Sequence, residues 1–349
     1  MINNSFFSTE ILRWFRENGR DLPWRETKDP YAIWLSEIIL QQTRIVQGWE
    51  YWERFMQTYP KVEDLAAASE DDVLKLWQGL GYYSRARNLH TAAKQIVALG
   101  AFPNTLEGIK SLKGVGDYTA AAIGSFAFDI PAAVVDGNVY RVLSRYFGID
   151  TPINSTQGKK EFAALAQSLL PASDAASYNQ GMMDFGAIQC TPQSPKCLLC
   201  PLAETCEALR CGRVEELPVK NKTVKVKTRH LSYIYIRCKS SVADGAGNTE
   251  PMIAIHRRGE GDIWQGLWEP YNVSDVKELP SFVKNPILLA KDVKHVLTHR
   301  ILLADFYLLE TETCPQLPDD YIWIKENEIE DYGVPRLIEI MLEKINPAE

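Results

Sequence analysis

The sequence predicts two domains of different class, an all-helical domain followed by a smaller α+β domain. The chain has 349 residues, whereas a single domain typically holds about 100 to 150. Apolar residues recur at helical spacing up to about residue 209, and the period changes to two after about residue 230. We therefore expect a helical domain over 1–209, a linker over 210–229 and an α+β domain over 230–349.

The individual elements follow from apolar spacing between Gly and Pro residues. Helices are expected at 10–17, 31–55, 71–78, 84–99, 118–128, 139–147 and 159–170. The second of these has a clear start, because Asp29 can cap a helix whose first turn holds Pro30. In the second domain, strands are expected at 230–237, 252–257 and 301–309, with a closing helix at 335–345.

Composition and regional charge narrow the class of protein. Hydrophobic residues make up 46% of the chain and charged residues 24%, which is a globular balance. No apolar run reaches the ~18 residues of a membrane span, and residues 1–10 do not resemble a signal peptide, so we expect a cytoplasmic protein without membrane contact. The net charge of −7 divides into +1 over 1–309, where 210–229 alone carries +5, and −8 over 310–349. The total therefore does not exclude a nucleic-acid partner.

Four of the seven cysteines lie within seventeen residues and predict a metal site. They are Cys190, Cys197, Cys200 and Cys206, spaced C-x6-C-x2-C-x5-C. Zinc and a [4Fe-4S] cluster both accept four cysteines, and the single C-x2-C pair favours the cluster over zinc. The other three, Cys211, Cys238 and Cys314, are expected to be ordinary thiols without partners, because disulfides are rare in reducing compartments.

Two carboxyl groups are candidates for catalysis. Glu37 lies in a mostly apolar helical stretch, so burial would raise its pKa toward the range of a general acid. Asp136 precedes a helix and is expected to cap it, which would keep its pKa low. Carboxyl groups held in opposite states suit cleavage of a glycosidic bond. An exposed Glu37 and a purely structural cap at Asp136 are the alternatives.

The segment Gly114-Val115-Gly116 joins two helical stretches. Two glycines around one apolar residue allow a tight turn whose backbone N–H groups, with the helix that follows, can bind a DNA phosphate. A plain helical hairpin is the alternative. No G-K-[ST] motif and no preceding strand accompany the glycines, which argues against a nucleotide-binding loop.

As an ordered set, these motifs resemble the helix-hairpin-helix DNA glycosylases, and within them the adenine DNA glycosylases of the MutY family. The segments that carry the resemblance are 22–25 (LPWR), the Glu37 helix with Gln41-Gln42-Thr43, 79–83 (GLGYY), the Gly114/Gly116 hairpin, 135–138 (VDGN), 179–184 (NQGMMD) and the four cysteines. The resemblance implies a helix-hairpin-helix over about 106–128 and a [4Fe-4S] cluster in the loop 190–206.

The same resemblance implies an activity. The enzyme would act on double-stranded DNA, flip out an adenine mispaired with 8-oxoguanine or guanine, and hydrolyse the bond between base and sugar. Glu37 would protonate the adenine, Asp136 would stabilise the positive charge on the sugar, and Tyr118 would support Asp136. Because the lesion has no two-fold symmetry, we expect a monomer, which would be nucleoid-associated in a bacterium.

Further positions match residues that contact the substrate in this family. Arg25 and Gln180 match contacts to the flipped base, and Gln42 and Tyr82 match residues wedged into the duplex. Position 118 separates the family from the related endonuclease III glycosylases and lyases, which carry a lysine nucleophile there. Since this chain has Tyr118, a monofunctional glycosylase is expected.

The second domain resembles the family's C-terminal module, which is related to Nudix hydrolases and recognises 8-oxoguanine. Residues 266–269 (GLWE) match it, whereas the acidic Nudix signature R-E-x-x-E-E-x-G is absent from the sequence, so we expect a binding module. Where the family has Phe-Ser-His, this chain has Leu297, Thr298 and His299, and Leu297 lacks the aromatic ring. Two other functions stay open: an endonuclease III-like glycosylase for damaged pyrimidines, and a non-catalytic iron-sulfur DNA-binding protein.

Overall fold

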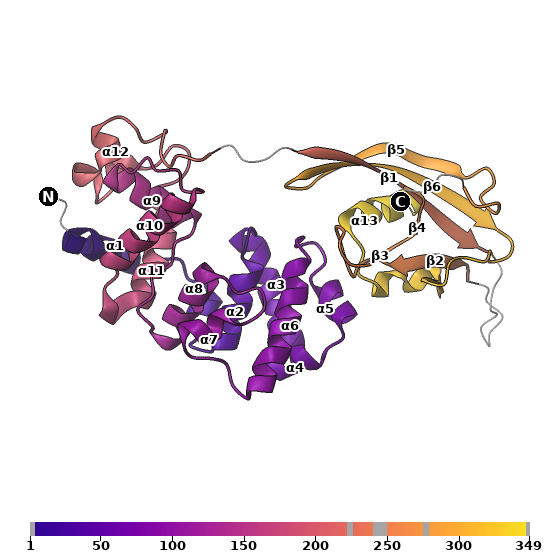
Figure 1. Ribbon diagram of the computed structural model, residues 1–349, viewed down its shortest axis with the longest axis horizontal. Coiled ribbons are helices and arrows are strands. Elements are labelled where there is room, and N and C mark those ends of the chain that lie inside the picture. Colours follow the sequence, from indigo (N-terminus) through magenta and orange to yellow (C-terminus); the bar gives the residue numbers. More distant parts are fainter. Residues whose placement is uncertain (1–3, 222–225, 240–249, 275–278, 347–349) are drawn as a thin grey trace. The chain divides into compact units, whose positions relative to one another are not determined.

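A computed structural model describes residues 4–221, 226–239, 250–274 and 279–346 (Figure 1). Residue contacts divide the chain into two compact units, which are described separately. The first unit holds residues 1–67 and 91–222, and the second holds 68–90 and 223–349. Within the described residues, no helix combines the length and the apolar character that crossing a membrane requires.

The first unit is helical. Its helices are α1 (Asn4–Asn18), α2 (Pro30–Ile39), α3 (Ile45–Thr58), α4 (Val62–Ala67), α7 (Leu106–Lys110), α8 (Asp117–Phe128), α9 (Gly137–Phe147), α10 (Thr156–Leu169), α11 (Ala175–Asp184) and α12 (Glu207–Arg210). Asp29 caps α2 as expected, since its side chain accepts a hydrogen bond of 3.0 Å from the backbone N–H of Tyr31.

The single helix expected over 31–55 is wrong, because the structure has two helices, α2 and α3, in this stretch. The break lies between Leu40 and Arg44, where Gln42 adopts a left-handed backbone conformation with φ of 58°. A bulky residue rarely adopts this conformation, and it cannot continue a right-handed helix. Apolar spacing alone does not reveal such a turn, because the pattern continues across it.

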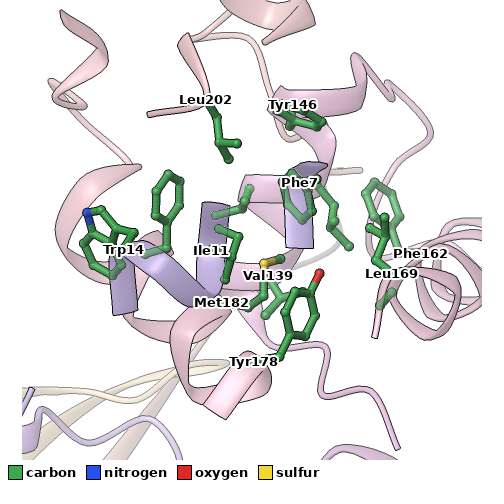
Figure 2. Close-up of a cluster of buried hydrophobic side chains, with 14 of the residues drawn as sticks. Phe7, Ile11, Trp14, Val139, Tyr146, Phe162, Leu169, Tyr178, Met182 and Leu202 are labelled. Atoms are coloured by element: carbon green, nitrogen blue, oxygen red, sulfur yellow. The ribbon is translucent and has the colours of Figure 1, made fainter. Parts of the chain in front are cut away.

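Among the described residues, two apolar clusters position the functional side chains of the first unit. One joins α1, α9, α10 and α11 through buried residues that include Phe7, Val139, Phe162 and Met182 (Figure 2). The other lies between α2 and α8 and includes Ile33, Ala122 and Phe126. The first cluster fixes the start of α9, and the second holds α2 against α8. Each full burial of a large aliphatic side chain contributes about 1.5–3 kcal/mol.

In the part of the second unit that the structure describes, seven strands form one sheet, and α5 (Glu70–Leu76) and the start of α6 (Ser84–Leu99) belong to the same unit. The strands are β1 (Lys227–Cys238), β2 (Met252–Arg257), β3 (Trp268–Glu269), β4 (Tyr271–Asn272), β5 (Ile287–Val296), β6 (Arg300–Thr311) and β7 (Tyr321–Lys325). Strands β1 and β6 pair in parallel, and the other pairs are antiparallel (Figure 1). The helix α13 (Arg336–Ile345) closes an apolar cluster on β1 and β6.

Strand β1 begins earlier than expected. It starts at Lys227, inside the segment 210–229 that was expected as a linker, because its backbone already pairs with Arg300 of β6 at that residue. The segment also holds the end of α12 and the described residues up to Asn221, whereas 222–225 lie outside the described residues. The charges of Lys227 and Arg229 are typical of a linker, whereas the strand is formed here by backbone pairing.

The expectation that Cys238 and Cys314 lack partners is wrong, because they form a disulfide with a Cα–Cα distance of 5.3 Å. The cause is the register of the sheet. Cys238 ends β1 opposite Thr311 of β6, and the chain then returns Cys314 to the same edge three residues later. Cys211 is a free, exposed thiol, as expected.

Removing the disulfide should destabilise the second unit under oxidising conditions only. We expect Cys314→Ser to lower stability by about 2–4 kcal/mol without reductant, because the crosslink restricts the unfolded chain. With dithiothreitol present, wild type and variant should unfold alike. Thermal unfolding with and without reductant measures this, and Cys211→Ser is the matched control. Two free thiols at 238 and 314 in the isolated, unreduced protein, found by alkylation and mass spectrometry, would contradict the disulfide.

Candidate active site and cluster loop

The first unit contains a cavity of about 490 Å³ where several predicted residues meet. Its walls include Glu37 from α2, Gln42 from the turn after α2, Tyr118 from α8 and Asp136 from the start of α9. These residues are up to about a hundred positions apart in the sequence, and helix packing brings them together. The remaining lining residues are Arg20, Leu40, Gln41, Thr43, Arg44, Ile45, Val135, Gly137, Asn138, Met183 and Ala187.

Glu37 is a buried acid, with 6% of its surface exposed. Its carboxyl accepts a hydrogen bond of 2.9 Å from the Tyr118 hydroxyl. Burial raises the pKa of Glu37 from 4.5 to about 7, although the Tyr118 hydrogen bond opposes this shift. The predicted direction of the shift is confirmed. A carboxyl group in this state can hold a proton near neutral pH and deliver it to a substrate in the cavity.

Tyr118 remains a hydrogen-bond donor throughout the physiological range. Burial raises its pKa well above 10, and the nearby charges of Glu37 and Asp136 add to the effect. The hydroxyl was expected to support Asp136, but it donates its hydrogen bond to Glu37. It fixes one oxygen of the Glu37 carboxyl without competing for the proton.

Asp136 caps α9, as the sequence predicted. One carboxylate oxygen accepts from the backbone N–H of Val139 at 2.8 Å, and the other accepts from the Asn138 side-chain amide at 2.8 Å. The expectation of a lowered pKa is wrong, because burial raises the pKa of Asp136 despite these hydrogen bonds. The cap is enclosed by the cavity, and desolvation outweighs the effect of the helix start.

Arg25 lies outside the lining of this cavity, where Arg20 is found instead. The guanidinium of Arg25 makes two hydrogen bonds, of 2.8 and 2.9 Å, to the carboxylate of Asp184, which also binds Arg20. Burial alone would raise the pKa of Asp184, but the hydrogen bonds from the two arginines outweigh it and lower the pKa. The positive charge of Arg25 is the smallest of the four effects on the pKa of Glu37, and it opposes the larger increase caused by burial.

Gln180 lies half-buried on α11 and does not line the cavity either. The sequence did not predict Arg20 as a cavity residue. Both Arg20 and Arg25 bind Asp184, and the sequence does not indicate which of the two lines the cavity.

The segment 114–116 forms the turn between α7 and α8. Gly114 has φ of 79°, which only glycine adopts readily, and Gly116 precedes the first residue of α8. The side chain of Val115 is buried and anchors the turn. Gly114 and Gly116 are exposed, and Asp117, the first residue of α8, pairs with Lys110 of α7.

The four cysteines of the loop line one small cavity, together with Arg145. All four are free thiols, and Arg145 donates a hydrogen bond of 3.4 Å to the sulfur of Cys190. Within the described ranges, no group of three or more Cys, His, Asp or Glu side chains is arranged to hold a metal ion. Four cysteine thiols around a common cavity are a ligand set that an iron-sulfur cluster accepts.

A chain of hydrogen bonds runs from Asp136 to this loop. Asn138 donates to Asp136, and Arg141 donates to the side-chain oxygen of Asn138 at 2.8 Å. Arg141 also donates to the backbone oxygen of Cys190 at 2.7 Å. Sequence reasoning did not single out Asn138 or Arg141. Their spacing of two and five residues after a helix cap was the available signal, since both positions then fall on the first turns of α9.

In the second unit, the other predicted substrate residues lie around one cavity of about 530 Å³. Tyr82, Leu297, Thr298 and His299 all contribute to its walls. The hydroxyl groups of Tyr82 and Thr298 form a hydrogen bond with each other. The four residues predicted to contact DNA from separate parts of the sequence thus form a single site.

Comparisons with known proteins agree with this architecture. Residues 35–171 match the HhH-GPD superfamily base excision DNA repair protein, residues 190–206 match the iron-sulfur binding domain of endonuclease III, and residues 247–344 match the NUDIX domain. A solved thermostable thymine-DNA glycosylase is 34% identical, with a TM-score of 0.56 over 60% of this chain and 97% of that chain. An endonuclease III trapped on DNA, 22% identical with a TM-score of 0.53, covers 61% of this chain and 99% of its own and shares the fold.

Fold and site together define a helix-hairpin-helix DNA glycosylase of base excision repair, with an iron-sulfur cluster loop and a Nudix-like C-terminal domain. Adenine DNA glycosylase from Buchnera aphidicola subsp. Schizaphis graminum is 31% identical over 97% of this chain and 98% of its own length. The enzymes of that name from Mus musculus and Homo sapiens are each 42% identical, over 61% and 60% of this chain and 44% and 41% of their own. The chain belongs to the adenine DNA glycosylase family.

Replacing the Glu37 carboxyl should stabilise the protein more at pH 8 than at pH 5. Because the folded-state pKa of about 7 exceeds the ordinary value of 4.5, the stabilising effect of protonated Glu37 is fully present below pH 4.5 and is lost as pH rises through 7. The loss reaches about 3 kcal/mol by pH 8. Glu37→Gln, which keeps the shape without the charge, avoids it.

Thermal unfolding of wild type and Glu37→Gln at both pH values measures this effect. The exposed Glu50 provides the matched control Glu50→Gln. A Glu37→Gln advantage of the same size at pH 5 and pH 8 would show that Glu37 is not a buried acid with a raised pKa.

Proposed function

We propose that this adenine DNA glycosylase excises adenine mispaired with 8-oxoguanine or guanine, and that it leaves the DNA strand uncut. The observation that carries the proposal is the convergence of Glu37, Tyr118 and Asp136 on one cavity, with the pKa of Glu37 raised to about 7. Family membership does not favour an endonuclease III-like pyrimidine glycosylase or a non-catalytic DNA-binding protein.

In the proposed reaction, the adenine leaves the DNA stack and enters the cavity, because the glycosidic bond is out of reach inside the duplex. Glu37 gives its proton to the adenine, and the bond between base and sugar then breaks with its electrons going to the base. The Asp136 carboxylate lies in the same cavity and stabilises the positive charge on the sugar. Water adds to the sugar, and its proton restores Glu37.

The monofunctional outcome rests on the residue at position 118. A strand-cutting glycosylase uses an amine that forms a Schiff base with the sugar, whereas the Tyr118 hydroxyl is already donated to Glu37. The nearest lysine in sequence, Lys113, is exposed at the hairpin turn, where a DNA phosphate is the simpler partner. The turn 114–116 would bind the phosphate through its backbone.

We propose that the cavity of the second unit reads the base opposite the adenine. Tyr82 and Thr298 would present their hydroxyl groups to 8-oxoguanine, with Leu297 and His299 beside them. Gln42 and Tyr82 would occupy the space left in the duplex, while Arg25 and Gln180 would support the pocket of the flipped base. The departure of Leu297 from the aromatic residue usual in the family is the main feature that sets this site apart.

For the iron-sulfur site we propose a [4Fe-4S] cluster held by Cys190, Cys197, Cys200 and Cys206. The four free thiols around one cavity and the match of residues 190–206 to an iron-sulfur binding domain support it. We also propose that the enzyme acts as a monomer, because a mispair has no two-fold symmetry for a dimer to match. It would work in the cytoplasm, associated with the nucleoid if the source is bacterial.

Glu37→Gln should abolish base release while leaving DNA binding in place. We expect a loss of at least about 100-fold in the single-turnover rate on a duplex with adenine opposite 8-oxoguanine, since the acid is gone. The wild-type rate should fall as pH rises above about 7, where Glu37 loses its proton. Glu50→Gln serves as the control.

Two outcomes of that assay would overturn parts of the proposal. Unchanged release by Glu37→Gln would rule out Glu37 as the acid. Efficient borohydride trapping of the wild-type enzyme on DNA would rule out the monofunctional mechanism, because trapping requires a Schiff base.

Cys197→Ser should reduce the iron and sulfide content of the protein. Under anaerobic purification we expect about four irons and four sulfides per wild-type chain, and fewer in the variant. Cys211→Ser, at an exposed cysteine outside the four, should retain the full content. One zinc per chain and no sulfide in wild type would contradict the cluster.

A further inference from the structure

Tyr82 and Trp264 share an uncommon backbone conformation and line the same cavity of the second unit. Among the described residues, they are the two aromatic residues with positive φ, at 47° and 60°. Bulky side chains adopt this conformation only when the surrounding structure enforces it, and such residues cluster at functional sites. The proposed function gives Tyr82 a role in DNA binding, and it leaves Trp264 without one.

Trp264 lies on the loop between β2 and β3, where a buried arginine holds it in place. Arg258 donates to the backbone oxygen of Ile263 at 2.9 Å and to the carboxylate of Asp262 at 2.7 Å. Its guanidinium also pairs with the buried carboxylate of Glu269. These bonds secure both residues that precede Trp264.

The indole ring of Trp264 contacts the side chains of Arg258 and His295. The guanidinium carbon of Arg258 lies 5.8 Å from its ring centroid, within cation–π range, and the ring of His295 lies 5.9 Å away at a tilt of 55°. Trp264 is only partly buried, so part of the ring remains open to the cavity. A ring fixed in this way loses little conformational freedom when a ligand packs on it.

The chemistry of the cavity fits a planar base. Apolar walls come from Leu80 and Leu297, and the paired hydroxyls of Tyr82 and Thr298 supply hydrogen-bonding groups at the same site. Leu297 brings no aromatic ring to it. Tyr83 and His299 also line the cavity, and Tyr83 is buried. Trp264 is the partly exposed aromatic residue whose ring is held by other side chains.

We propose that Trp264 is a lesion-binding residue whose ring packs against the base opposite the excised adenine. This inference rests on the proposed function, in which the cavity of the second unit reads that base. Stacking on an aromatic side chain depends on the face of the base and tolerates different bases. Trp264 therefore contributes affinity for any planar base, while the hydroxyl pair distinguishes 8-oxoguanine from guanine.

The test compares duplexes that differ only opposite a non-hydrolysable adenine analogue, where they carry 8-oxoguanine, guanine or an abasic site. Trp264→Leu should weaken binding to the 8-oxoguanine duplex about tenfold and leave binding to the abasic duplex unchanged, because no base is present there. Trp264→Phe keeps a ring and should bind within roughly threefold of wild type. Trp323→Leu removes a tryptophan of the same unit that does not line this cavity and is the control.

A rescue variant makes the test independent of any general damage to the domain. In Trp264→Leu/Leu297→Phe, the new ring at position 297 should restore most of the lost affinity for the 8-oxoguanine duplex. Equal losses on the 8-oxoguanine and abasic duplexes, no loss at all, or equal losses in Trp264→Phe and Trp264→Leu would each overturn the role of Trp264. Equal wild-type affinity for 8-oxoguanine and guanine would instead overturn the proposed lesion recognition.

Discussion

The active site depends on keeping one carboxyl group away from water. Glu37 lies on the buried face of α2, and the close approach of α8 brings the Tyr118 hydroxyl onto it. Desolvation is the largest cause of its raised pKa, because burial favours the neutral acid. When Glu37 ionises, the same burial lowers the free energy of unfolding. The apolar contacts between α2 and α8, which include Ile33 and Ala122, must offset that cost. Catalysis and stability are therefore opposed at this residue.

The start of α9 links the catalytic cavity to the cluster loop. Asp136 both caps the helix and lines the cavity, and Asn138 and Arg141 connect it to the backbone of Cys190. Arg145, one turn further along α9, is buried and binds the sulfur of Cys190 and the backbone of Thr191. One helix thus orients a catalytic carboxylate at its first residues and organises the cysteine loop two turns later. This gives the loop a physical connection to the catalytic carboxylate even though no cysteine lines the catalytic cavity.

What the sequence could predict was mostly local. The cap at Asp29, the cap at Asp136 and the raised pKa of Glu37 follow from neighbouring residues, and all three agree with the structure. The direction of the pKa shift of Asp136 could not be predicted from its neighbours in sequence, because it depends on how deeply the carboxyl group is buried in the folded protein. The disulfide between Cys238 and Cys314 depends on the pairing of β1 with β6, which no spacing in the sequence encodes.

The other differences between prediction and structure come from contacts between residues far apart in the sequence. Asp184 is fully buried and binds both Arg20 and Arg25, so the arginine that lines the cavity is decided by three-dimensional packing. The same holds for residues 68–90, which look like part of a continuous helical domain yet pack with the C-terminal part of the chain. There Arg257 pairs with Glu70 at 2.9 Å, and Arg87 donates to the backbone of Gln265. These contacts attach Tyr82 to the unit that holds Thr298, so a residue from the middle of the helical sequence becomes part of the C-terminal site.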